Sequence, residues 1–341
     1  MPLPLFIGVA ILATGWGAKK GIDAKKDFSK ADEYNDRARK MFNEASTKLD
    51  KARQETNESF EDLGRIKLKA YNKTITNWIS LVEQIKNKHM DKSKIEVDGF
   101  RLSTESEFLE LKEISLSMSE IAGAGTASLA TGVLAGLGAY GGATTFAAAS
   151  TGAAISGLSG VAATNATLAW FGGGSLATGG LGMAGGTAVL GGIVAGPILL
   201  AAGMIAASKA EKARADAYSN LKGAEVEVEN LNAATLIADN MKAFAKSLTK
   251  ALIALESNLA GILTKLASIV ASSTNFRTYS QHEQIQVYMS FLIAVSMKDL
   301  INLSIMTKDG SYNKSEFGNF VCLLSKYNSD IKVLNNKIQS I

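Results

Sequence analysis

The sequence predicts an all-α protein in which two long, coiled-coil-like helical arms flank a glycine- and alanine-rich hydrophobic helical hairpin. Three observations support this fold class. The chain of 341 residues has only three prolines, Pro2, Pro4 and Pro197, so almost nothing in its interior forbids helix. Apolar residues recur at three- and four-residue steps on both sides of the centre. The centre itself, residues 121–208, contains no charged residue and no histidine.

The N-terminal segment, residues 1–22, begins with an uncharged apolar stretch from position 2 to 18 that is followed by several lysines. Three interpretations remain open: a membrane anchor, an apolar helix packed in the protein, or a cleaved signal peptide. The stretch lacks the positively charged start of a signal peptide, and its length lies at the lower end of the range that spans a bilayer. If it spans, the lysines are expected on the cytoplasmic side.

The N-terminal arm, residues 23–120, begins with a helical pattern from about 23 to 88. Gly64 is the one plausible break, so a continuous helix is favoured and two antiparallel helices turning near Gly64 are the alternative. Lys67 departs from the apolar series. That series comprises Ala31, Tyr34, Ala38, Met41, Ala45, Leu49, Ala52, Phe60, Leu63, Tyr71, Ile75, Trp78, Val82 and Ile85.

The same arm continues through a loop or short strand pair at 91–103, where Asp98 and Gly99 are a turn signal. A second helix is expected to start at Thr104, with Glu107 as its capping-box partner. It runs past Met118 into the uncharged centre.

The C-terminal arm, residues 209–341, is predicted to hold a long helix at 209–272 and shorter helices at 280–306 and 314–341, with a turn at 308–310. The apolar run 285–297 is only 13 residues long, which favours a core helix over a membrane span. The single cysteine, Cys322, excludes an internal disulfide framework. It lies in an apolar run, so a buried structural thiol is expected.

The central segment, residues 121–208, is 88 residues long and contains 22 of the 32 glycines. Because an ordinary soluble domain is about a quarter charged, a charge-free run of this length must be buried in protein, in lipid, or in each at different times. It provides two long or up to four short helices, with breaks expected at 150–152 and 172–174. An even number of spans, which is favoured, leaves both arms on the same side of a membrane.

Small residues in the central segment recur every four residues, which is the pattern that membrane helices use for close packing. Trp170 and Phe171 are expected as interfacial aromatic residues, although a packed hairpin turn is equally consistent. The predicted helix-packing glycines are Gly174, Gly182, Gly186, Gly192 and Gly196.

The hydrophobicity of the central segment is marginal for membrane insertion. Its strongest stretch, 187–206, has eight Leu, Ile, Val or Phe residues, whereas 122–141 has four. At roughly −0.3 to −0.6 kcal/mol for each such residue, the strongest stretch contributes only about −2 to −5 kcal/mol. This weakness favours a conditional inserter over a constitutive anchor.

Catalysis, metal binding and nucleic-acid binding are not predicted. The net charge of +4 is small for this length, which argues against a nucleic-acid binder. His89 and His282 are the only histidines, and no His, Cys or carboxylate pair has metal-ligand spacing. No Gly-Lys-Ser/Thr follows the glycine runs, so no phosphate loop and no cofactor are expected. The protein is predicted not to be an enzyme.

The arrangement of residues 104–270 resembles that of α-helical pore-forming proteins, and the glycine-rich text at 175–212 resembles the membrane segment of apolipoprotein L-like proteins. The resemblance implies membrane insertion and ion leakage, with a role as a toxin or defence effector. The partners expected are a lipid membrane and further copies of the chain, and the location expected is membrane-associated with a soluble form.

Two other functions fit the same pattern. The first is a membrane-anchored helical scaffold whose arms bind a partner protein without permeabilising the bilayer. The second is an assembly protein that forms helical filaments.

Overall fold

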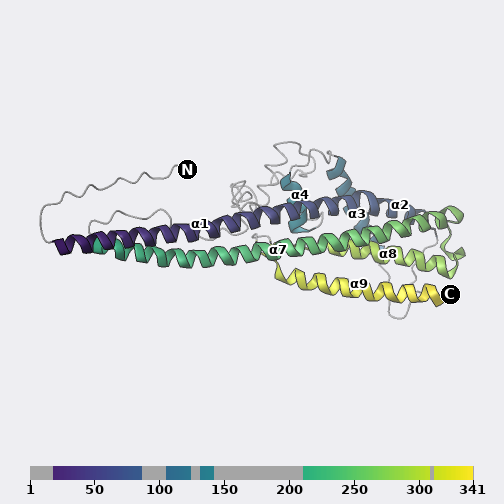
Figure 1. The fold of residues 1–341 in the computed structure, drawn as a ribbon. Coiled ribbons are helices and arrows are strands. Elements are labelled where there is room, and N and C mark those ends of the chain that lie inside the picture. The colour runs from purple at the N-terminus through teal and green to yellow at the C-terminus, as the bar shows by residue number, and fades with distance from the viewer. Residues whose placement is uncertain (1–17, 87–104, 124–130, 142–209, 308–310, 341) are drawn as a thin grey trace. The chain divides into compact units, whose positions relative to one another are not determined.

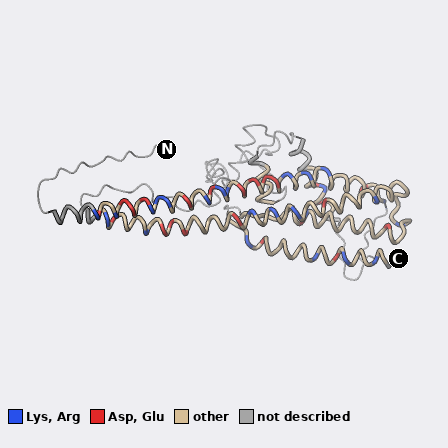
Figure 2. The backbone as a smooth tube through the Cα atoms, viewed as in Figure 1, with Lys and Arg blue, Asp and Glu red and all other residues tan. Residues whose placement is uncertain are grey.

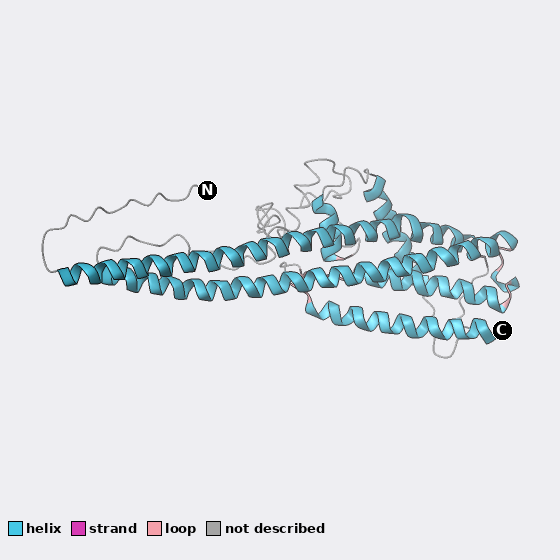
Figure 3. Ribbon diagram, in the orientation of Figure 1, coloured by secondary structure: helices cyan, strands magenta, loops and turns pink. Residues whose placement is uncertain are grey.

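The computed structural model describes residues 18–86, 105–123, 131–141, 210–307 and 311–340 (Figure 1). The chain divides into two compact units. The first contains residues 18–48 and 210–232, and the second contains the described residues from 49 to 141 and from 233 to 340. Among the described residues the extended elements are all helices, accompanied by two isolated β-bridges (Figure 3). The all-α fold class is therefore confirmed.

The N-terminal arm is helical without interruption from Ala18 to Gln84. Helix α1 (Ala18–Lys69) continues into a π-helical segment, η1 (Ala70–Ile75), and then into α2 (Thr76–Gln84). The expected continuous helix is thus confirmed, and the alternative of a turn near Gly64 is wrong. Gly64 lies inside α1, where it allows another helix to approach.

The core of the first unit is built from small residues of α1 and from the start of α7 (Ala210–Ser272). Alanines of α1 are buried at seven-residue steps, which is the spacing of a coiled-coil seam. The buried apolar residues of this unit are Ala31, Ala38, Ala45, Ala217, Leu221 and Leu231.

The two helices of the first unit run in the same direction. Asp27 pairs with Arg214 at 2.9 Å, and the rings of Tyr34 and Tyr218 meet edge to face with centroids 5.7 Å apart. The residue in α7 with the higher number contacts the residue in α1 with the higher number, so the two helices are parallel. Figure 2 shows acidic and basic residues along this part of α1.

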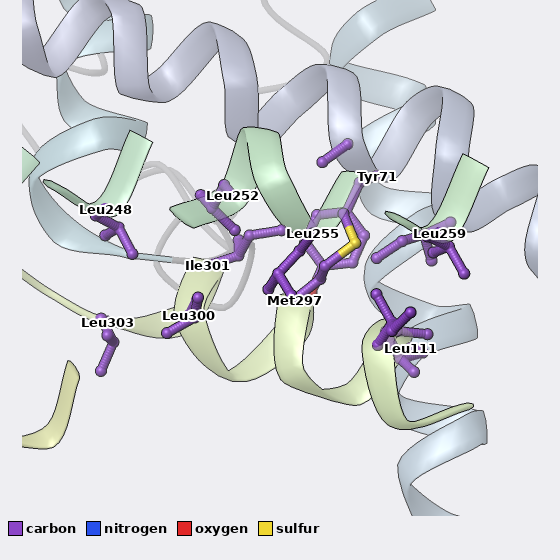
Figure 4. Packing of buried hydrophobic residues seen from close by; sticks show 14 of the residues in the cluster. Tyr71, Leu111, Leu248, Leu252, Leu255, Leu259, Met297, Leu300, Ile301 and Leu303 are labelled. Carbon is purple, nitrogen blue, oxygen red and sulfur yellow. The ribbon is translucent and has the colours of Figure 1, made fainter. Parts of the chain in front are cut away.

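The second unit adds α3 (Glu105–Gly123), α4 (Thr131–Tyr140), α8 (Gln281–Asn302) and α9 (Lys314–Ser340) to α1, α2 and α7. Its core is a continuous cluster of buried side chains (Figure 4). The apolar stripe predicted for α7 is buried in this unit from Met241 to Leu266, whereas Leu236 is 62% exposed. Most of the run 285–297 of α8 is also buried, as expected for a core helix. The stripe includes Leu248, Leu252, Leu255, Leu259 and Leu266.

Helices α1 and α7 are also parallel in the second unit. Lys242 Nζ lies 2.9 Å from a carboxylate oxygen of Glu55, and Lys69 Nζ lies 3.1 Å from one of Glu256. Both pairs are separated by 187 residues along the chain, so the two helices keep one register here. The two arms therefore pack against each other along these residues.

The helices α2, α3 and α8 meet around Trp78. Its indole Nε1 donates a hydrogen bond to Ser290 Oγ at 2.9 Å, and its ring packs edge to face against Phe108 and Phe291. Such contacts satisfy the one polar atom of a fully buried indole. The start of α8 is fixed by a capping box between Ser280 and Glu283.

The three predicted C-terminal helices are present, although α8 ends at Asn302 and not at 306. The expected burial of Cys322 is wrong. Cys322 is exposed on α9. The buried apolar residues of α9 are Phe320, Tyr327 and Leu334, seven residues apart. Because each residue turns a helix by about 100°, the side chain two positions after Phe320 points to the opposite side.

Several predictions lie outside the described residues. These are the interpretations of residues 1–17, the loop or strand pair at 91–103, the helix breaks at 150–152 and 172–174, and the turn at 308–310. The helix expected from Thr104 is present as α3, which begins at Glu105.

Candidate functional site

The charge-free central segment is the candidate site, and the structure describes its first part. The last three residues of α3, all of α4 and Gly141 belong to it. The predicted packing glycines and the interfacial aromatic residues lie outside the described residues. They are Gly174, Gly182, Gly186, Gly192, Gly196, Trp170 and Phe171.

Helix α4 is embedded in the second unit. Every residue from Leu134 to Gly141 is buried. A helix without a polar face has no side to expose to water, so it is stable in a soluble protein only when it is surrounded. Residues 134–141 of the central segment are therefore buried in protein in this structure.

Helices α1 and α4 cross at a pair of glycines. A Cβ atom added to Gly64 would lie 2.0 Å from the carbonyl oxygen of Leu134, and one added to Gly138 would lie 2.0 Å from that of Phe60. Each glycine thus faces the backbone of the other helix. Side chains larger than hydrogen are excluded at both positions, because real Cβ atoms do not approach an oxygen so closely. The contact is of the small-residue type that the sequence predicts for helix pairs in membranes.

The last four carbonyl groups of α4 lack partners within the helix, as at every helix end. All four accept hydrogen bonds from outside it. Lys67 Nζ donates to the carbonyls of residues 137 and 138, at 3.2 Å each. The backbone amides of Ile305 and Met306 donate to the carbonyl oxygen of residue 139 at 2.8 and 3.0 Å. Ser304 Oγ donates to the carbonyl oxygen of Tyr140.

Gly141 completes this end of α4. Its φ of +86° is a left-handed conformation that glycine adopts without a steric penalty. A Cβ there would also lie 2.5 Å from the carbonyl oxygen of Asn302. The chain leaves α4 through a position that requires glycine for two separate reasons.

Lys67 is fully buried, and its ammonium group is held by three carbonyl oxygens. Besides the two of α4, it donates to the carbonyl of Leu303 at 3.4 Å. Three acceptors match the three N–H groups of a charged lysine. A cation at a helix C-terminus is also favoured by the helix dipole. Burial opposes the charge and lowers the pKa of Lys67 to about 7.

A second polar group of this unit lies where α3 packs against α8. Lys298 is almost buried and pairs with Glu110 at 2.7 Å. Burial, and after it the carboxylates of Glu110 and Asp299, raise the pKa of the Tyr71 hydroxyl well above its ordinary value. Burial likewise raises the pKa of Asp299, although Lys298 opposes this. These charges connect α3, the helix that leads into the central segment, to the bundle.

One described helix is long and apolar enough, by length and composition, to cross a membrane. It is residues Ala213–Ser272 of α7, and 33% of its most apolar stretch is buried. The core helix of a soluble bundle meets the same criteria, and α7 supplies much of the core of the second unit. The sequence analysis predicts membrane-active residues in the central segment instead, and from 142 onward this segment lies outside the described residues.

The contacts at the end of α4 were not predicted from the sequence, although two signals for them are present. Lys67 stands at a position of the apolar stripe of α1. A charged residue at such a position indicates a buried polar group that has a specific partner. Gly64 lies within a helical pattern that no other residue breaks, which indicates close approach of a second backbone.

Comparison of the chain with models of known protein families, with curated proteins and with solved structures found no match.

Proposed function

We propose that this protein inserts into a lipid bilayer and perturbs or permeabilises it through residues 121–208, while the charged arms stay in water. The observation that carries the proposal is the burial of α4. An 88-residue charge-free run contains a helix, α4, whose residues 134–140 are buried within a charged helical bundle. A soluble form that encloses apolar sequence is what a protein needs to reach a membrane through water.

The energetics of the central segment support conditional insertion. The most apolar stretch, 187–206, contributes roughly −2 to −5 kcal/mol towards insertion, before its glycines and Pro197 reduce the value. A bundle that buries part of the segment competes with insertion on this scale. The balance between protein and lipid is then set by conditions at the membrane.

Association between inserted helices would use the predicted glycines. Small residues allow backbones to approach in lipid, where no hydrophobic driving force joins helices. The crossing of Gly64 and Gly138 supports this use, since glycines of this chain already mediate close helix contact. The resemblance to apolipoprotein L-like proteins supports a role as a toxin or defence effector that acts as a homo-oligomer.

A second candidate function is a membrane-anchored scaffold that binds a partner protein without permeabilising the bilayer. Exposed apolar side chains on the arms favour it. Phe317 and Val321 lie one turn apart on α9 and are 41% and 52% exposed. Such side chains are suited to helix-to-helix contact with a partner.

Dye release from liposomes distinguishes the two functions. Ala195→Asp places a carboxylate in the most apolar stretch, and a charge at the bilayer centre costs at least ~2.5–3.5 kcal/mol. This cost is comparable with the whole insertion tendency of the stretch, so leakage should be abolished. Ala195→Ser, which changes the same position without adding charge, should retain leakage.

The folding of all three proteins is checked by circular dichroism. Equal leakage from the wild type and Ala195→Asp would exclude insertion through this stretch. Absence of leakage from the wild type across lipid compositions and pH values would leave the scaffold as the better interpretation.

A further inference from the structure

We propose that the seat of α4 in the second unit is a latch, which holds the central segment in the bundle and must open before that segment can enter a membrane. The latch is defined as the crossing of Gly64 with Gly138 together with the contacts of Lys67 and residues 304–306 at the end of α4. Its effect on insertion rests on the proposed function. Its existence as a separable contact does not.

The first argument is the size and composition of α4. It has 10 residues, fewer than an isolated helix needs for stability in water. Three of its residues are glycines, Gly132, Gly136 and Gly138, and each lowers helix stability further. The helix therefore depends on its surroundings, and a change in these contacts decides whether it forms.

The second argument is where the polar contacts act. Lys67, Ser304, Ile305 and Met306 all bind the last turn of α4. The chain continues from this turn into residues 142–208. A force that draws that segment away would act first on the hydrogen bonds of this turn, so these bonds hold the segment at its point of attachment.

The third argument is that the crossing of α1 and α4 has no room for any side chain larger than hydrogen at Gly64 or Gly138. Both glycines meet backbone atoms, which cannot move aside as a flexible side chain can. A single added methyl group must therefore separate α4 from α1. Separation also withdraws the carbonyls of α4 from Lys67, which is three residues from Gly64 on the same helix. The crossing and the polar contacts are thus coupled.

The coupling gives the latch two states instead of a graded response. When α4 is seated, Lys67 is satisfied by three carbonyl groups and the four terminal carbonyls have donors. When α4 leaves, two of the acceptors of Lys67 leave with it. A partly opened state would leave the buried amine of Lys67 without two of its three hydrogen-bond acceptors, which is unfavourable in either protonation state.

The test uses the full chain and hydrogen exchange measured by mass spectrometry. Gly138→Ala and Gly64→Ala each introduce the methyl group from one side of the crossing. Amides of residues 131–140 should exchange at least ~10-fold faster in both variants, because local opening controls their exchange. Amides of residues 241–266 in α7 should keep the wild-type rate.

Two control variants match this change. A Cβ added to Gly261 or Gly318 meets no atom within 4 Å, so Gly261→Ala and Gly318→Ala should leave the exchange of α4 unchanged. Ser304→Ala is a milder opening variant, since it removes one hydrogen bond without a steric clash. It should raise the exchange of α4 in the same direction and by a smaller factor.

Dye release from vesicles of phosphatidylcholine and phosphatidylglycerol gives the second readout. Opening variants should release dye several-fold faster than the wild type. The latch is overturned if α4 and α7 exchange faster together, or if α4 exchange is unchanged in the opening variants. A third outcome would show that the latch does not control insertion. In that outcome the wild type releases dye measurably, and the opening variants release it at the same rate although their α4 exchanges faster.

Failure of the proposed function has a different outcome. In that case α4 opens selectively in the glycine variants, and neither these proteins nor the wild type release dye. The latch then stands as a structural contact, and permeabilisation by residues 121–208 is excluded.

Discussion

At the scale of single residues, Lys67 shows how a charge can be kept in an apolar core. Its ammonium group donates hydrogen bonds to the backbone carbonyls of residues 137, 138 and 303. Carbonyl dipoles at the end of a helix compensate part of the cost of burial. The remainder appears as a lowered pKa.

The pKa of Lys67 predicts a specific pH dependence of stability. The unfolded chain holds this proton up to about 10.5, whereas the folded protein releases it above about 7. Between these values the unfolded state binds more protons, so the free energy of unfolding rises with pH, by about 1.4 kcal/mol per pH unit. Below about pH 7 both states are protonated, and the contribution to the slope vanishes.

Lys67→Met should remove this contribution, because methionine does not titrate. The measurement is urea unfolding across the window, with the slope compared between the wild type and the variant. Lys73→Met, which changes an exposed lysine of η1, serves as the control and should retain the wild-type slope. Equal slopes for the wild type and Lys67→Met would show that Lys67 does not change protonation on unfolding.

At the scale of elements, α3 illustrates how differently two ion pairs can act on one helix. Glu110 pairs with Lys298 of α8, whose side chain is 8% exposed. Lys112 pairs with Glu83 of α2, and both of these side chains are more than 40% exposed. Water screens the second pair and replaces it readily when it is broken, whereas Lys298 has little access to water.

Removing one carboxylate from each pair should therefore have unequal effects. Glu110→Ala leaves Lys298 with Asp299 at 3.8 Å as its remaining carboxylate and should cost roughly 1–3 kcal/mol of stability. Glu83→Ala should cost about 1 kcal/mol or less. Denaturant unfolding of the two variants tests this difference. Losses of the same size would mean that the connection between α3 and α8 does not depend on the pairing of the buried Lys298 with Glu110.

At the scale of the whole molecule, the central segment contributes to the helical core and is also the segment of the proposed membrane function. Its first described helix belongs to the core of the second unit, since Leu134 and Leu137 are buried there. The arms alone are therefore not the complete core of this unit. We expect the division between this core and the proposed membrane segment to fall within the charge-free run, beyond Gly141.

Replacement of the segment by a linker of equal length, rich in Gly, Ser and Glu, tests this division. A chain with residues 142–208 replaced should melt cooperatively and close to the wild type, because α4 is retained. A chain with residues 121–208 replaced should lose roughly 3 kcal/mol or more, since two buried leucines at about 1.5–3 kcal/mol each are removed. Thermal unfolding followed by circular dichroism is the measurement, and indistinguishable melting of the two chains would refute a core role for α4.

The sequence by itself determined the helical class, the continuous N-terminal helix and the apolar stripes of α1, α7 and α8. These features follow from local periodicity and from the absence of interior proline, which act within a few residues of one another. The start of α8 at Ser280 was predictable for the same reason. The exposure of Cys322 was not predictable in this way. Apolar residues flank it in sequence and lie on more than one face of α9, so the local pattern does not show which face is buried.

Only the tertiary structure decided that α1 and α7 are parallel, that Gly64 marks a crossing and that Lys67 is buried at the end of α4. Each of these depends on partners distant in sequence: Lys67 and Leu137 are 70 residues apart, and Lys67 and Leu303 are 236 apart. A glycine in a helix has the same local propensity whether it faces water or another backbone. A lysine within an apolar stripe is likewise explained only by the carbonyl groups that a second and a third segment of the chain bring to it.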